Sequence, residues 1–278
     1  MRSLRLLLLA LSLLWASLAS AAAPRWLGSA PKEKPQRIVT LAPSLTEVVI
    51  DLGGGGALVG VSRYDDAPEV RELPRVGGFL DPAPEAVLAL APDLILAQPS
   101  PGNRGPVEQL ARLGVPVLIL PLDTVDEALA SVRAVAKALH DPAAGDALVD
   151  TIRGGIESIR GKVAGAPRTK VLLVYGWQPL VVAGPGSFAH ELLVAAGGEN
   201  VAAGATGAYP TLSAEAALAA DPVLVIDATG GHGAGKPLPG WEGRVRTLTS
   251  PGLFRPGPRM LEALAELARL LHPEVAAR

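Results

Sequence analysis

Residues 85–97 read EAVLALAPDLILA, and residues 215–227 read EAALAADPVLVID. The two stretches share Glu, Ala, Leu, Ala, Pro and Leu in register, and each has the pattern of a short helix, a proline-containing turn and a buried strand. A second echo occurs in the same order, because residues 47–54 and 191–198 each run from a glutamate to a pair of glycines. Ala- and Leu-rich stretches also match by chance, but two ordered echoes favour a duplicated architecture of two similar lobes.

Short apolar runs rich in β-branched residues alternate with helical patterns along the rest of the chain. A parallel sheet covered by helices on both faces has this alternation. The stretch Ser44-Leu-Thr-Glu47 predicts a capping box at a helix start. The expected strands are 37–41, 58–61, 93–97, 115–120, 170–175, 180–183, 223–227 and 245–248.

Residues 126–166 separate the two groups of strands and are helical in composition. The pattern breaks near Asp141-Pro142, which predicts a long helix over 143–163 after a shorter one. The expected fold is α/β, with two Rossmann-like lobes joined by a single long α-helix and a ligand cleft between the lobes. The expected boundaries are a signal peptide at 1–23, a flexible leader at 24–36, an N-terminal lobe at 37–125, a connecting helical segment at 126–166 and a C-terminal lobe at 167–272.

The N-terminus has the pattern of a secretory signal peptide. Arg2 and Arg5 precede an apolar run over 6–18, and the small residues 19–23 offer Ala-x-Ala-like cleavage sites. The apolar run is too short to span a bilayer. Because the chain has no cysteine, it has no disulfide and no site for a lipid anchor of the usual bacterial kind. We therefore expect a protein that is free in the periplasm.

Charge and motifs exclude several classes of function. The chain has 25 basic and 27 acidic residues and no basic stripe, so nucleic acid is not an expected partner. The four histidines lack a compact metal-ligand spacing, so neither a metal site nor a cofactor is expected. The glycine loop 230–236 imitates a P-loop, but Pro237 replaces the Ser or Thr that would bind Mg²⁺. No nucleophile elbow occurs, so the chain is not expected to be an enzyme.

Aromatic residues are rare, and most of them fall on predicted loops or strand ends. Tyr64 follows the predicted strand 58–61, and Tyr175 ends another, with Trp177 two residues on. Phe79 lies in a Gly-Gly-Phe turn and Tyr209 in a loop rich in Gly, Ala and Pro. Loops at the carboxyl ends of parallel strands are where open α/β sheets bind ligands. Aromatic side chains offered there by both lobes suit a large, flat, partly apolar molecule, although local packing explains any single one of them.

The echo also gives each lobe one acidic residue at an equivalent place. Glu85 and Glu215 lie in the first turns of their helices, where a carboxylate suits the helix dipole. That preference alone explains both residues. The functional alternative is that they dock onto basic residues of a two-fold symmetric partner.

The stretches RIVTLAPSLTEVVIDLG, VGVSRYDDAP, RVGGFLDPAPEAVLALAPDLILA and AAGGENV resemble the vitamin B12-binding proteins of ABC importers, within the receptors for siderophores, haem and cobalamin. The resemblance covers residues 37–271. It implies two α/β lobes joined by one helix, little closure on the ligand, and a monomer that takes cobalamin as its transported ligand. It places Tyr64 and Phe79 of the N-terminal lobe, and Tyr175, Tyr209 and Arg255 of the C-terminal lobe, in contact with the corrin, and it assigns Glu85 and Glu215 to arginines of the membrane-spanning subunits.

Three alternatives to a cobalamin receptor stay open at this point. A haem receptor needs an axial ligand, for which Tyr64, Tyr209 or His232 is available. A ferric-siderophore receptor needs several cations facing an anionic chelate, and Arg255, Arg259 and Arg63 are the candidates. An exported hydrolase is the remote alternative, because no nucleophile and base are assembled in the sequence.

Overall fold

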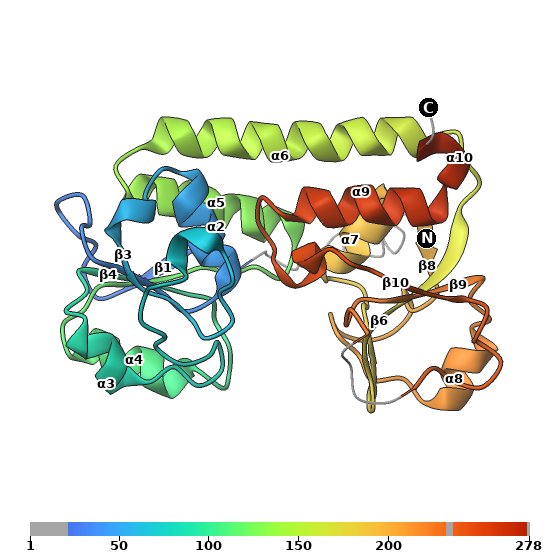
Figure 1. Ribbon diagram of the computed structural model, residues 1–278, viewed down its shortest axis with the longest axis horizontal. Helices are drawn as coiled ribbons and strands as arrows, with labels where there is room; N and C mark the ends of the chain where they lie inside the picture. The colour runs from blue at the N-terminus through green and yellow to red at the C-terminus, as the bar shows by residue number, and fades with distance from the viewer. Residues whose placement is uncertain (1–21, 232–235, 277–278) are drawn as a thin grey trace, which may run out of the picture.

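The computed structural model describes residues 22–231 and 236–276, and it contains two five-stranded sheets, each with helices on both faces (Figure 1). Most of the predicted signal peptide and His232 lie outside the described residues. Among the described residues, no helix has the length and apolar character that a membrane span requires.

The N-terminal lobe is built on a sheet of order β1-β5-β4-β2-β3, in which only β1 runs antiparallel to its neighbour. Its strands are β1 (Arg25–Leu27), β2 (Ile38–Thr40), β3 (Leu58–Gly60), β4 (Leu94–Ala97) and β5 (Val117–Ile119). Its helices are α2 (Pro43–Asp51), α3 (Pro84–Ala89), α4 (Arg104–Arg112) and α5 (Val125–Ala138), with 3₁₀ turns at Gly55–Ala57 and Pro68–Val70.

The C-terminal lobe has the order β10-β9-β6-β7, and β8 pairs with the first half of β6 beside β7. Its strands are β6 (Thr169–Trp177), β7 (Leu180–Val182), β8 (Gly198–Asn200), β9 (Leu224–Asp227) and β10 (Val245–Thr247). Its helices are α7 (Phe188–Ala195), α8 (Ala214–Ala219), α9 (Met260–Leu271) and α10 (Pro273–Ala276), with a 3₁₀ turn at Pro251–Phe254.

The two lobes repeat one connectivity. The parallel pairs β2–β3, β2–β4 and β4–β5 of the first sheet correspond to β6–β8, β6–β9 and β9–β10 of the second. The first sequence echo covers α3–β4 and α8–β9, and the second covers the ends of α2 and α7. Both of those helices end at a glycine with positive φ, Gly53 at 72° and Gly197 at 84°. The duplication predicted from the echoes is therefore confirmed.

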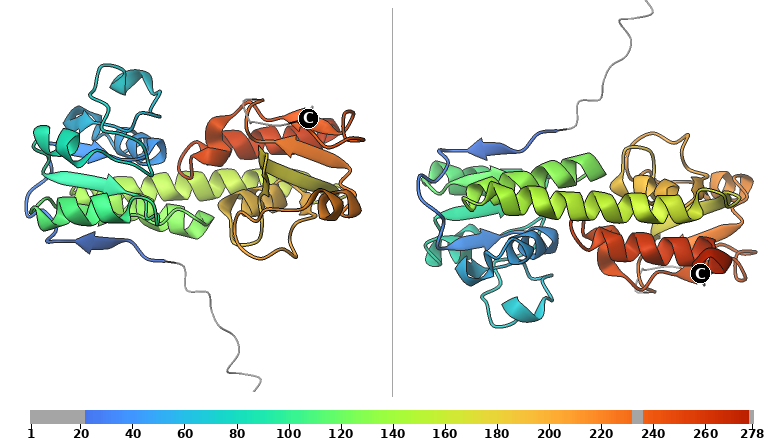
Figure 2. Two further views of the ribbon diagram at one scale, coloured as in Figure 1. Left: turned by 90° about the horizontal axis from the view of Figure 1, so that it is seen from below. Right: turned by 90° about the horizontal axis from the view of Figure 1, so that it is seen from above.

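Helix α6 (Pro142–Val163) connects the lobes and confirms the predicted long helix. Asp141 caps its start by accepting a hydrogen bond from the Ala144 amide at 3.0 Å. Its 22 residues give a length of about 33 Å, and Figure 2 shows it running along both lobes. Close to its start α6 packs tightly on α5, because a Cβ at Gly145 would lie 2.4 Å from the Cβ of Ala136.

One continuous apolar core runs through both lobes on the α6 side of the sheets. It joins Leu45 and Leu129 of the N-terminal lobe through Ile152 of α6 to Leu192 and Leu264 of the C-terminal lobe. Two smaller clusters lie on the opposite faces of the sheets, one in each lobe. The lobes therefore share a core and are not independent units tied by a linker.

All eight predicted strands are present, but three local predictions are wrong. Residues 24–36 were expected to be a flexible leader, yet they begin with β1, whose backbone pairs with the edge strand β5. Strand β8 was missed because its sequence, Gly-Glu-Asn, has no apolar pattern. The capping box at Ser44 does not form, because Pro43 starts α2 one residue earlier and Glu47 bonds elsewhere.

Candidate functional site

Three aromatic rings meet on loops and a strand end of the C-terminal lobe. The Tyr175 ring packs edge-on against Tyr209, with centroids 5.0 Å apart, and against Phe254, with centroids 4.8 Å apart. Tyr209 is 39% exposed and Phe254 is 51% exposed. This trio therefore presents an aromatic surface to solvent, whereas Tyr175 lies half-buried behind it.

The loop that carries Tyr209 is fixed against strand β7. The amides of Val182 and Gly184 donate hydrogen bonds to the carbonyls of Pro210 and Ala208. A Cβ at Gly184 would lie 2.4 Å from the Gly207 carbonyl oxygen, so only glycine permits this approach. The position of Tyr209 is therefore set by main-chain contacts.

Both tyrosine hydroxyls of the trio keep their protons. The Tyr175 hydroxyl donates to the Leu253 carbonyl at 2.5 Å, and burial raises its pKa well above the usual value. Burial, followed by the nearby Asp123 carboxylate, also raises the pKa of Tyr209. These hydroxyls are therefore neutral hydrogen-bonding groups.

Tyr64 and Phe79 lie on two loops of the N-terminal lobe. The Tyr64 ring is 59% exposed, with the Arg63 guanidinium 5.7 Å from its centroid. Phe79 is half-buried, and its carbonyl accepts a hydrogen bond at 2.9 Å from the buried side chain of Asn103. Asn103 also holds the Gln98 carbonyl at 2.9 Å, so it ties the Phe79 turn to the loop after β4.

An ion-pair cluster joins these aromatic loops across the lobe boundary. The Arg255 guanidinium binds Asp66 through two hydrogen bonds of 2.7 and 2.9 Å, and Glu47 through one of 2.6 Å. Because Arg255 follows Phe254 and Asp66 lies two residues after Tyr64, the cluster links the two segments that carry these exposed rings. Arg255 is only 9% exposed, so its guanidinium is committed to these carboxylates.

The ionisation of the cluster follows from its contacts. The Arg255 guanidinium lowers the pKa of Asp66, and Asp66 in turn is the largest cause that raises the pKa of Arg255. Burial raises the pKa of Glu47, although Arg255 and Arg259 oppose that shift. One oxygen of Glu47, Oε2, is buried without a hydrogen-bond partner among the described residues.

A second contact between the lobes lies at the repeat-related glutamate. Glu191 of α7 occupies the place of Glu47 of α2, and its Oε2 accepts a hydrogen bond from the Val125 amide of α5 at 2.7 Å. The Phe188 amide also donates to the Asp123 carbonyl, at 2.6 Å. Each lobe thus contributes one equivalent glutamate that bonds to the other lobe.

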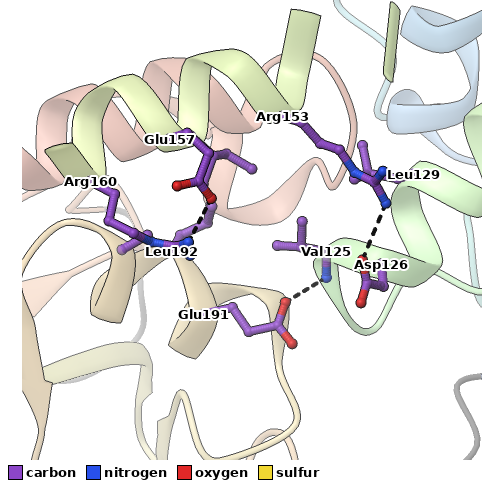
Figure 3. Close-up of a pocket in the computed structure, with 10 residues that line it drawn as sticks. Val125, Asp126, Leu129, Arg153, Glu157, Arg160, Glu191 and Leu192 are labelled. Atoms are coloured by element: carbon purple, nitrogen blue, oxygen red, sulfur yellow. Dashed lines mark hydrogen bonds and ion pairs between the residues drawn. The ribbon is translucent and has the colours of Figure 1, made fainter. Parts of the chain in front are cut away.

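Figure 3 shows this second contact at the edge of a cavity of about 330 Å³ between α5, α6 and α7. Two arginines of α6 line the cavity and are already paired. Arg153 lies 3.8 Å from Asp126, and Arg160 lies 2.6 Å from Glu157. The cavity is therefore a charge-balanced gap between helices.

A larger cavity, of about 660 Å³, lies in the N-terminal lobe beside the Asn103 loop. Arg25 of β1, Arg104 of α4 and Asp123 are among its lining residues. Arg104 is paired with Glu108 at 2.8 Å. Asp123, whose carboxylate contributes to the raised pKa of Tyr209, also lines this cavity.

Trp177 lies apart from the aromatic trio. It is 8% exposed and packs with Trp241 in the apolar cluster on the opposite face of the second sheet. The β6–β7 register shifts between Val174 and Gly176, and this bulge places Tyr175 and Trp177 on different faces although they are two residues apart. Phe254, which was not among the predicted site residues, is the third ring of the trio in place of Trp177.

Glu85 and Glu215 lie on exposed first turns of α3 and α8. Figure 1 shows these two helices on the side of the molecule opposite α6. Hydrogen bonds from its own amide and from the Ser213 hydroxyl lower the pKa of Glu215. In the part of the chain that the structure describes, no group of three or more His, Asp or Glu side chains is arranged to hold a metal ion.

Comparison with known proteins identifies the class. Residues 38–236 match the family described as periplasmic binding protein. A vitamin B12-binding protein of Salmonella typhimurium is 31% identical over 204 residues, which are 73% of this chain and 74% of that one. The chain therefore belongs to the periplasmic binding protein family, whose members are solute-binding transport components and not enzymes.

Solved structures agree on the two-lobed fold. The crystal structure of periplasmic vitamin B12 binding protein BtuF of Vibrio cholerae is 26% identical with a TM-score of 0.74, covering 88% of this chain and 99% of that one. The periplasmic heme-binding protein RhuT from Roseiflexus sp. RS-1 is 28% identical with a TM-score of 0.75, covering 86% and 99%. Backbone similarity alone therefore does not separate the two ligands.

Proposed function

We propose that the protein captures cobalamin in the periplasm and delivers it to an ABC importer. The observation that carries the proposal is the aromatic surface of Tyr175, Tyr209 and Phe254, which lies next to the Arg255 ion pairs that join the two lobes. A corrin ring is broad and partly apolar, and stacking against such rings suits it. The sequence relative in Salmonella carries the name vitamin B12-binding protein, which supports this ligand.

Haem is the second candidate, because a heme-binding protein is among the structural neighbours. A tyrosine that coordinates ferric iron must lose its hydroxyl proton. Burial and Asp123 both raise the pKa of Tyr209, and the Tyr175 hydroxyl is bonded to a carbonyl, so neither residue suits that role. Tyr64, which is 59% exposed, is the tyrosine that is left as a candidate axial ligand, so haem is tested beside cobalamin.

Calorimetric titration of the exported protein with cyanocobalamin, and in parallel with haemin, tests the ligand. We expect saturable one-to-one binding of cyanocobalamin. The variants Tyr209→Ala and Phe254→Ala each remove one exposed ring, and each should weaken binding by about 1–3 kcal/mol. Leu113→Ala, which truncates a similarly exposed apolar side chain on another surface, should leave the affinity unchanged. Binding of haemin alone would contradict the proposal.

We propose further that Glu85 and Glu215 seat the loaded protein on arginines of the membrane-spanning subunits. Their equivalent positions, their exposure and their location on one side of the molecule support this role. A two-fold symmetric importer would meet one glutamate with each of its halves.

Charge reversal separates docking from capture. The double variant Glu85→Arg/Glu215→Arg should bind cyanocobalamin normally and lose importer-dependent uptake, because like charges meet at both contacts. The matched control is Asp150→Arg/Glu157→Arg on α6, at the opposite side of the molecule, which should keep both binding and uptake. Normal uptake by the first variant would rule out the docking role.

Export by a cleaved signal peptide completes the proposal. The charged start, the apolar run over 6–18 and the following small residues support it. We propose that the processed chain then acts in the periplasm as a monomer.

A further inference from the structure

Glu127 is a buried carboxylate at the start of helix α5. It is 5% exposed, and its Oε2 accepts a hydrogen bond from the Asp123 amide at 2.9 Å. Its Oε1 accepts a second hydrogen bond from the main-chain nitrogen of Ala22, at 2.7 Å, across 105 positions of sequence. The chain at the end of the predicted signal peptide is therefore held by the first turn of α5.

Negative charge is concentrated around this contact. Asp123, Asp126 and Glu191 lie near Glu127; burial and the neighbouring acids raise the pKa values of Asp123 and Glu191. Among residues 22–231 and 236–276, no basic side chain forms an ion pair with Glu127. The neighbouring residue in the sequence, Asp126, lies 3.8 Å from Arg153 in an ion pair that is largely exposed. Glu127, the buried carboxylate of this acidic group, therefore has no cationic partner in the described part of the chain, and burying an unpaired carboxylate costs free energy.

The sequence offers a source for that cation. Residues 19–21 are Ala-Ser-Ala, an Ala-x-Ala cleavage motif, and the same alanine-rich stretch also permits cleavage after Ala22 or Ala23. We infer that the leader is removed between Ala21 and Ala22, and that the α-ammonium group released on Ala22 forms an ion pair with Glu127. This inference rests on the proposed export, and it moves the end of the signal peptide two residues before the position expected from sequence.

Cleavage at either of the other two positions would leave the buried Glu127 carboxylate with one hydrogen bond fewer. Cleavage after Ala22 or Ala23 removes the nitrogen that bonds to Oε1 of Glu127. Cleavage after Ala21 keeps that nitrogen and changes it from a neutral amide to a cation, which makes the hydrogen bond charge-assisted. Ala22 itself is exposed, so the remaining N–H groups of its ammonium stay hydrated.

The same contact makes the folded state sensitive to processing. With the leader attached, the nitrogen of Ala22 is a neutral amide, and the acidic group keeps its uncompensated charge. The mature chain should therefore be the more stable of the two, and part of its stability is gained only when the leader is removed.

Intact-mass analysis and N-terminal sequencing of the protein purified from the periplasm test the junction. We expect a chain that starts at Ala22. A periplasmic protein that starts at Ala23, Pro24 or any other residue would overturn the inference and leave the proposed function standing. A chain that keeps its leader and stays in the cytoplasm would overturn both.

A double-mutant cycle tests the ion pair. One chain starts at Ala22 and the other carries one extra serine before it, so that the nitrogen of Ala22 is an amide. We expect Glu127→Gln to lower the melting temperature by about 2–4 °C more in the first chain than in the second. Asp126→Asn, at the exposed neighbouring acid, should show no such difference between the chains. Equal effects of Glu127→Gln in both chains would overturn the ion pair.

Discussion

Arg255 illustrates how a single side chain holds two lobes in register. Its guanidinium pairs with an exposed carboxylate, Asp66, and a buried one, Glu47, both from the opposite lobe. Removing one member of a buried pair is costly because the other is left without its counter-charge. The resemblance assigns Arg255 to the ligand, whereas these contacts give it a structural partner already, and the two roles predict different measurements.

We expect Arg255→Met to lower the free energy of unfolding at pH 7 by about 3 kcal/mol, measured by urea denaturation. The control is Arg269→Met, at an exposed arginine in the last turn of α9, and it should change the free energy of unfolding little. A variant of normal stability that no longer binds cobalamin would contradict the structural role and assign the guanidinium to the ligand.

The loss should also depend on pH. Arg255 lowers the pKa of Asp66, so the stability from that pair is fully present above the unfolded value near 4 and is lost as the pH falls through the lower folded value. Glu47, whose pKa is raised by burial, protonates earlier on acidification and then needs no counter-charge. The difference between wild type and Arg255→Met should therefore shrink in acid.

At the scale of elements, helix α6 depends on small residues where it touches its neighbours. Gly145 faces the Cβ of Ala136 on α5, whereas Gly154, nine residues on, has no atom near the position of a Cβ. Both glycines lie inside one helix, so they share the intrinsic gain that alanine brings to a helix interior. Only their surroundings differ.

Gly145→Ala should therefore destabilise the protein by about 1–3 kcal/mol, since α5 and α6 must separate. Gly154→Ala should stabilise it by about 0.5–1 kcal/mol through helix propensity alone. Thermal and urea unfolding of the two variants, compared with wild type, check both signs. A stabilising Gly145→Ala would show that the α5–α6 contact relaxes freely.

The elements also show what can be read from the sequence. Eight strands were predicted correctly because most of them are apolar runs with buried side chains, such as β2, β4 and β5. Strands β1 and β8 have no such pattern and form through backbone pairing with a neighbour. Trp177 was predicted to share the site with Tyr175 because residues two apart on a regular strand lie on the same face. The bulge that separates them depends on the pairing of β6 with β7, which no local pattern records.

For the molecule as a whole, the shared apolar core decides how it unfolds. The cluster that joins the lobes through α6 contains residues from both sheets' inner faces, so neither lobe can lose its packing alone. We expect one cooperative transition in urea, with tryptophan fluorescence and far-ultraviolet circular dichroism following the same curve. Trp177 and Trp241 report on the C-terminal lobe and Trp26 on the N-terminal lobe. Two separate transitions would show that the lobes fold independently.

The repeated connectivity has a consequence for the encounter with a dimeric importer. If Glu85 and Glu215 dock on a two-fold symmetric importer as we propose, the approximate equivalence of the two halves allows two docked orientations related by a half-turn, and each offers one glutamate to each importer subunit. Two equivalent orientations would double the share of encounters that can lead to docking, with no added contact. The two orientations would also present opposite faces of an asymmetric cargo to the importer entrance, so the translocation path would have to accept the cargo in either orientation.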